Sequence, residues 1–105
     1  MIELNGENFE SEVLKADMPV LVDFWSESCV PCKELMPDVH KLSEVYSGKM
    51  KFCKLNIQGN RRLAMSQQVM SLPSIVFYIN GEKKEHLTGN DLDIALIEKT
   101  LKTFI

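Results

Sequence analysis

An excess of positive charge and long apolar segments are both missing from this sequence. The formal net charge of its 105 residues is -3, so the chain offers no basic face to nucleic acid or to an anionic membrane. No apolar run approaches the length of a membrane span, and the first residues lack the basic and apolar regions of a secretory signal. We therefore expect a cytoplasmic protein that binds neither nucleic acid nor membrane.

Linkers, repeats and low-complexity segments are missing as well. A chain of 105 residues can bury one modest core and has no room for a second. Its 45% of hydrophobic and 26% of charged residues are typical of a globular protein. We expect residues 1–105 to form a single domain that is monomeric.

Cysteine is scarce, and two of the three cysteines, Cys29 and Cys32, stand three residues apart. Residues 20–25 before them are apolar and rich in β-branched and aromatic side chains, which predicts a buried strand. Pro31 suits the first turn of a helix, where its missing N–H is not needed. Cys29 would then lie at a helix N-terminus, where unpaired N–H groups and the helix dipole favour a thiolate.

This position matters because the thiolate is the reactive form of cysteine. A thiol with a pKa near ~8.5 is about 3% ionised at pH 7, whereas one with a pKa of about 7 is half ionised. The alternative for a Cys-x-x-Cys pair is a zinc site, which needs about four ligands. The other candidates, Cys53, His40 and His86, are scattered, so the pattern favours redox chemistry with no metal or cofactor.

Asp23 is the only charged residue within the predicted buried strand at residues 20–25. An ionised carboxylate is costly to bury, so the pKa of Asp23 should rise until the group can hold or pass a proton near neutral pH. The alternative is a structural carboxylate paired with Lys54, and both interpretations can hold together because a nearby ammonium would tune the same pKa.

The rest of the chain predicts further strands and helices in alternation. Hydrophobic periodicity and turn residues indicate a strand at 2–4, a helix capped by Asn8, a helix at 31–46, a strand at 51–57, a short helix at 60–68, strands at 74–79 and 83–88 joined by Asn80-Gly81, and a helix starting at Asn90 or Asp91. This order predicts the α/β class, with a central mixed sheet and helices on both faces.

Four side chains outside the cysteine pair received an interpretation of their own. Met65 and Met70 are expected to fill gaps in the core, although exposed methionines near Pro73 would suit adaptable protein binding. Cys53 is expected to be buried and unreactive. His86 is expected to be exposed on an edge strand.

The stretch from Phe24 to Lys33, Phe-Trp-Ser-Glu-Ser-Cys-Val-Pro-Cys-Lys, resembles the active-site stretch of the thioredoxin family, usually Trp-Cys-Gly-Pro-Cys-Lys. The resemblance continues along the chain in Lys54-Leu55-Asn56, Leu72-Pro73-Ser74, Asn80-Gly81-Glu82 and Gly89. Two positions differ: Ser28 replaces a common second tryptophan, and Val30 replaces a common glycine. The resemblance implies the thioredoxin fold.

The resemblance also implies a protein dithiol-disulfide oxidoreductase that reduces protein disulfides. Cys29 would be the nucleophile and Cys32 the resolving thiol, and the two would form the redox disulfide. Asp23 would move the proton of Cys32, tuned by Lys54. The electron donor would be a thioredoxin reductase, and the clients would be proteins that carry disulfides.

A substrate-binding surface is implied in the same way. It would consist of residues around the cysteine pair: Trp25, Val30, Pro31, Leu72, Pro73 and Gly89. In the family, the proline matching Pro73 follows a cis peptide bond, and the main chain before it pairs with the substrate's extended backbone.

Two other functions stay open at this point. Within the same chemistry, the protein could be a disulfide oxidase or isomerase, although Pro31 in the second spacer position favours a reductant. From another class, it could be an adaptor that uses the fold for binding and has no catalytic role, because a fold alone does not establish activity.

Overall fold

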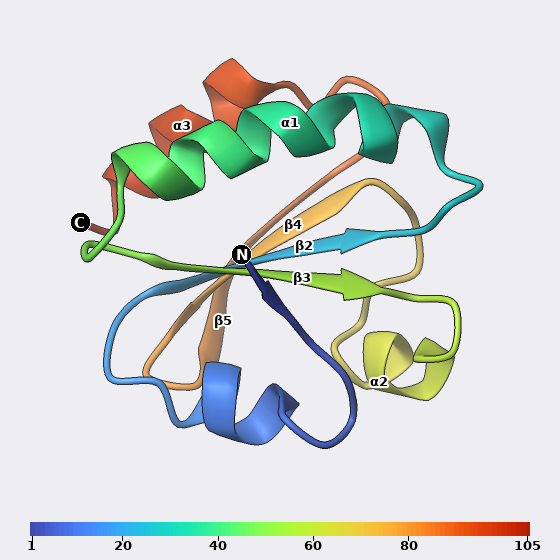
Figure 1. Cartoon of the computed structure of the whole chain (residues 1–105), viewed down its shortest axis with the longest axis horizontal. Helices are drawn as coiled ribbons and strands as arrows, with labels where there is room; N and C mark the ends of the chain where they lie inside the picture. Colours follow the sequence, from blue (N-terminus) through green and yellow to red (C-terminus); the bar gives the residue numbers. More distant parts are fainter.

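The computed structural model describes residues 1–105 and contains one five-stranded sheet. The elements in chain order are β1 (Ile2–Glu3), the short π-helix η1 (Glu10–Leu14), β2 (Val20–Trp25), α1 (Val30–Val45), β3 (Lys51–Asn56), α2 (Arg61–Ser66), β4 (Ser74–Ile79), β5 (Glu82–Thr88) and α3 (Ile94–Lys102). The strand order is β1-β3-β2-β4-β5 (Figure 1). The β1/β3 and β3/β2 pairs are parallel and the β2/β4 and β4/β5 pairs antiparallel, which confirms the predicted mixed sheet.

Helices cover both faces of this sheet, as the sequence predicts. α1 and α3 lie on one face, and η1 and α2 lie on the other (Figure 1). The central strand β2 is buried on both sides because its residues alternate between two clusters: Leu21 packs in the cluster under α1 and α3, and Val22 in the cluster over η1 and α2. None of the helices has the length and the apolar character that crossing a bilayer requires.

The N-terminal helix is not capped by the residue that the sequence suggested. Phe9 precedes η1, and no side chain caps it. The amide of Asn8 instead folds back, donating to the Glu3 carbonyl at 3.0 Å and accepting from the Asn5 N–H at 2.8 Å. The Asn8 side chain therefore makes its hydrogen bonds within the preceding turn and does not cap η1.

The start of the last helix was also predicted wrongly. Asn90 and Asp91 lie in a turn, and α3 begins at Ile94 with Asp93 as its N-cap. The Asp93 carboxylate accepts a hydrogen bond from the Leu96 N–H at 2.9 Å. Asn90, Asp91 and Asp93 all have side chains that can cap a helix, and only Asp93 does so in the structure.

The hairpin of β4 and β5 forms at Asn80-Gly81 as predicted. Both residues have positive φ, 52° and 81°, as this turn requires. A Cβ on Gly81 would lie 2.6 Å from the carbonyl oxygen of Leu14, so the turn also packs tightly against the end of η1. On β5, His86 is half-buried and not exposed as expected, because its ring reaches back over β4.

Candidate active site

The first turn of α1 holds Cys29 and Cys32 in a disulfide. The two Cα atoms lie 5.3 Å apart, and Cys29 is the N-cap of the helix, with its sulfur 3.3 Å from the backbone N of Cys32. Cys29 is half-buried and reachable from solvent, whereas Cys32 is only 1% exposed. An incoming disulfide can therefore meet the Cys29 sulfur, with Cys32 behind it.

The helix terminus supplies the electrostatics that a reactive thiol needs. The backbone N–H of Cys32 points at the Cys29 sulfur, where the positive end of the helix dipole also acts. Both effects stabilise a thiolate more than a thiol at this position.

Asp23 lies on β2 with its side chain on the sheet face that α1 covers. The alternation of the strand puts it on the same side as Leu21, the side covered by α1, the helix that carries Cys32. Its side chain is 1% exposed, and its Oδ2 atom has no hydrogen-bond partner. Burial raises the pKa of Asp23 from 3.8 to about 7, and the charge of Lys54 opposes this rise.

Lys54 is the residue opposite Asp23 on the neighbouring parallel strand β3. The four ion pairs of the structure lie elsewhere, so the direct Asp23–Lys54 pair weighed from the sequence is not formed. Lys54 therefore acts on the Asp23 carboxyl through its field alone, and the carboxyl is left free to take up a proton near pH 7.

A hollow of about 600 Å³ opens beside Cys29, and we call it the client groove. Its walls come from four stretches that are distant in sequence: the start of α1 with the turn before it, the segment from the end of β3 into α2, the loop before β4, and Asn90. Val30, Pro31 and Leu72 line it, as the resemblance implies, together with Ser26, Ser28, Ile57, Gln58, Arg61, Met70, Ser71 and Asn90. The groove places Leu72 and the accessible sulfur on one surface.

The other three residues expected at this surface are placed differently. Pro73 is buried and follows the cis peptide bond that was expected, and its carbonyl accepts a hydrogen bond from the Gly89 N–H at 3.4 Å. Trp25 lines a separate hollow together with Lys33 and Lys54. None of the three lines the client groove, although each is next in sequence to a residue that does: Ser26, Leu72 and Asn90.

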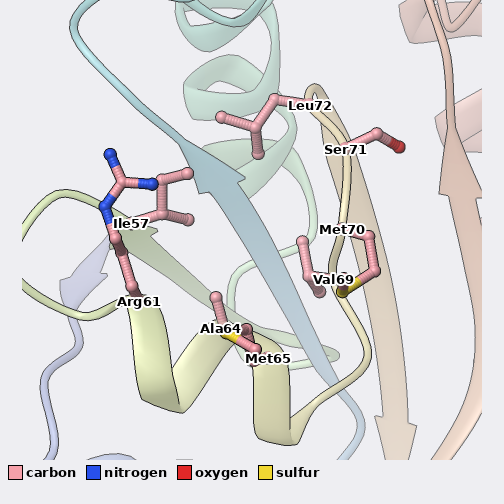
Figure 2. A pocket seen from close by; sticks show the side chains of 8 residues that line it. All are labelled: Ile57, Arg61, Ala64, Met65, Val69, Met70, Ser71 and Leu72. Carbon is pink, nitrogen blue, oxygen red and sulfur yellow. The ribbon is translucent and has the colours of Figure 1, made fainter.

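A smaller pocket of about 230 Å³ adjoins the client groove and shares five lining residues with it, including Arg61 and Leu72. Figure 2 shows this pocket between α2 and the loop before β4. Met65 and Met70 line it and are 60% and 78% exposed, so the expectation that they fill the core is wrong. The neighbouring Ala64 and Val69 are buried in the core instead of the two methionines.

Sequence reasoning missed the contribution of α2 to this surface. Ile57 and Arg61 line both hollows, yet neither belongs to a recognisable motif. Their place depends on how α2 packs under the sheet, and the six residues of α2 are too few for periodicity to reveal an exposed side. No group of three or more His, Cys, Asp or Glu side chains with metal-binding geometry occurs in the structure.

Comparison with known proteins agrees with this geometry. The family model described as Thioredoxin matches residues 1–103. The chain belongs to the thioredoxin family. A thioredoxin of Acetoanaerobium sticklandii is 44% identical over 105 residues, which are the whole of both chains. A thioredoxin of Peptoclostridium acidaminophilum is 47% identical over 91 residues, 87% of this chain and 83% of that protein.

A third thioredoxin, from Rickettsia bellii, is 40% identical over 95 residues, or 90% of each chain. With the family shown and the Cys29–Cys32 disulfide in place, the chain is a dithiol-disulfide oxidoreductase with protein-disulfide reductase activity. Membership also implies disulfide-containing client proteins and a reductase that restores the dithiol.

Proposed function

We propose that Cys29 is the nucleophile and Cys32 the resolving thiol of a reductant of client proteins. The Cys29 thiolate attacks one sulfur of the client disulfide, whose bond breaks, and the released client thiolate takes up a proton. The Cys32 thiolate then attacks the Cys29 sulfur, which re-forms the internal disulfide and releases the second client thiolate. Two electrons pass from this chain to the client.

The second step needs Cys32 to lose its proton inside the protein. Cys32 is 1% exposed, so water is a poor acceptor for it, and Asp23 is the buried carboxylate on the adjoining face of the sheet. A pKa of about 7 lets Asp23 accept that proton and release it again at neutral pH. Lys54 tunes this pKa through its charge.

Client binding is assigned to the client groove with Trp25 at its side. Val30, Pro31 and Leu72 supply apolar contact next to the reactive sulfur, and Pro73 and Gly89 shape the loop behind them. The main chain at Leu72 would pair with an extended client segment, which suits many different sequences. The exposed thioethers of Met65 and Met70 add adaptable contact beyond it.

We propose a thioredoxin reductase as the electron donor. Ser28 and Val30 lie on the surface that such a donor must contact, and Ser28 offers a hydroxyl where the family commonly has an aromatic ring. Turnover with purified candidate reductases identifies the donor. We further propose that residues 1–105 act as a single monomeric domain in the cytoplasm, where glutathione and thioredoxin systems keep the dithiol reduced.

The observation that carries this proposal is the pairing of an accessible Cys29 with a buried Cys32 at one helix terminus. Cys29→Ser should abolish reduction of insulin disulfides, and Cys32→Ser should accumulate mixed disulfides with clients. Cys53→Ser is the matched control, because it makes the same change at a cysteine remote from the groove, and it should retain insulin reduction. Full activity of either active-site variant would contradict the scheme.

A further inference from the structure

Behind the client groove, polar side chains of β4 and β5 form a connected chain of hydrogen bonds that the proposed mechanism does not use. It begins at Lys83, whose Nζ lies 3.3 Å from Nδ1 of His86. Nε2 of the same ring lies 3.1 Å from Oγ of Ser74, a residue with no exposed surface. The chain then reaches the loop that forms one wall of the groove.

At the loop, the hydrogen bonds end on two backbone carbonyls. Ser74 Oγ donates to the carbonyl of Ser71 at 2.7 Å, and Thr88 Oγ1 donates to the carbonyl of Pro73 at 2.9 Å. The Ser71 hydroxyl lies 3.1 Å from Thr88 Oγ1, and Ser74 Oγ lies 3.0 Å from the same atom. The residues on either side of Leu72 are thus both tied to this network.

The protons of the network can be assigned consistently from its one permanent donor. The ammonium of Lys83 can only donate, so Nδ1 of His86 accepts and Nε2 carries the ring proton, which it donates to Ser74 Oγ. The Ser74 hydroxyl donates to the Ser71 carbonyl, and the Ser71 hydroxyl can donate to Thr88 Oγ1. Thr88 keeps its own proton for Pro73. Every donor therefore has an acceptor.

The loop held in this way is the wall to which the client would bind. Ser71 and Leu72 line both the client groove and the adjoining pocket. Figure 2 shows them on the loop that borders the pocket. We propose that Thr88, supported by Ser74 and His86, is a positioning residue that fixes the main chain at Leu72 for pairing with the client. This inference rests on the function proposed above and names the residues that hold its docking edge.

Replacing Thr88 by valine tests this role, because Thr88→Val keeps the shape of the side chain and removes the hydroxyl. Loss of one hydrogen bond should raise the KM for insulin about threefold to tenfold and leave kcat unchanged. Reduction of a small aromatic disulfide such as dithiobis(nitrobenzoate), which needs no extended pairing, should keep its rate. Thr88→Ser restores the donor and should restore the parent KM.

Thr100→Val is the matched control, because Thr100 also donates from Oγ1 to a carbonyl, that of Leu96 at 2.9 Å, but lies on α3. An unchanged insulin KM in Thr88→Val, or an equal rise in Thr100→Val, overturns the inference. If Thr88→Val is poorly folded by thermal unfolding, His86→Leu removes the donor to Ser74 and should raise KM in the same direction; no rise overturns the inference. A parent protein that does not reduce insulin defeats the proposed function itself.

Discussion

Asp23 gives the clearest consequence at the scale of a single residue. Its carboxyl has a pKa of about 7 in the folded protein and about 4 when unfolded, because burial opposes its charge. Between these values the folded chain binds more protons than the unfolded chain, so the free energy of unfolding falls as the pH rises from about 4 to 7. Above pH 7 the loss is complete and no longer changes.

We therefore predict that Asp23→Asn flattens this pH dependence. At pH 8 the variant should have a larger free energy of unfolding than the parent, by about 2 to 4 kcal/mol, because it removes an ionised buried group with an unpaired oxygen. Urea unfolding of the oxidised proteins at pH 5 and pH 8 measures it. Parallel curves for parent and variant across this range would show that Asp23 titrates normally.

The same variant should slow the resolving step. Without a proton acceptor behind Cys32, mixed disulfides with insulin should persist longer in Asp23→Asn than in the parent at pH 7. Acid quenching and gel separation of the mixed species measure this lifetime. An unchanged lifetime would leave Asp23 with a structural role only.

At the scale of the element, two glycines separate the cost of a positive φ from the cost of a steric clash when a side chain is added. Gly81 and Gly48 have nearly equal φ, 81° and 84°, but only Gly81 faces a neighbouring backbone, at 2.6 Å. Gly48→Ala should lower the free energy of unfolding by about 1 to 2 kcal/mol, the cost of a left-handed alanine. Gly81→Ala should cost clearly more, since Leu14 must also move. Equal decreases in the free energy of unfolding, measured with urea, for the two variants would mean that the end of η1 moves away from the new Cβ at no cost.

The start of α3 offers a second comparison between neighbouring residues. Asp93 caps the helix through the Leu96 N–H, whereas Asp91 is exposed in the preceding turn. Asp93→Ala should lower the free energy of unfolding by about 1 kcal/mol, and Asp91→Ala should change it little. If urea unfolding gives the reverse order, the helix begins where the sequence first suggested.

These elements also show how far sequence alone could go. The strands, α1 and the hairpin followed from periodicity and from Asn80-Gly81. The place of the cysteine pair at a helix start and the raised pKa of Asp23 followed from residue spacing and from an acid in an apolar strand, whereas the substrate-binding residues came from the family resemblance. The caps of η1 and α3, the exposure of Met65 and the partial burial of His86 did not follow. Each of these depends on which neighbour a side chain reaches after packing, and local sequence does not contain that information.

At the scale of the whole molecule, Cys53 reports on global unfolding. It lies fully buried on β3, between β1 and β2, and burial raises the pKa of its thiol to about 12. Iodoacetamide should therefore modify Cys29 rapidly in the native reduced protein and leave Cys53 intact until denaturant opens the sheet. Mass spectrometry of the alkylated chain measures this order. Early labelling of Cys53 would mean that β1 opens locally.

The exposure of Met65 and Met70 has a consequence for how peroxide would change this protein. Peroxide converts an exposed methionine to its sulfoxide, a polar and chiral group, whereas the buried thiol of Cys53 is protected from it. Sulfoxide formation at these two positions would alter the surface proposed to bind clients and would not change the sulfurs of Cys29 and Cys32. Repair by methionine sulfoxide reductase would then restore recognition without any new synthesis of the chain.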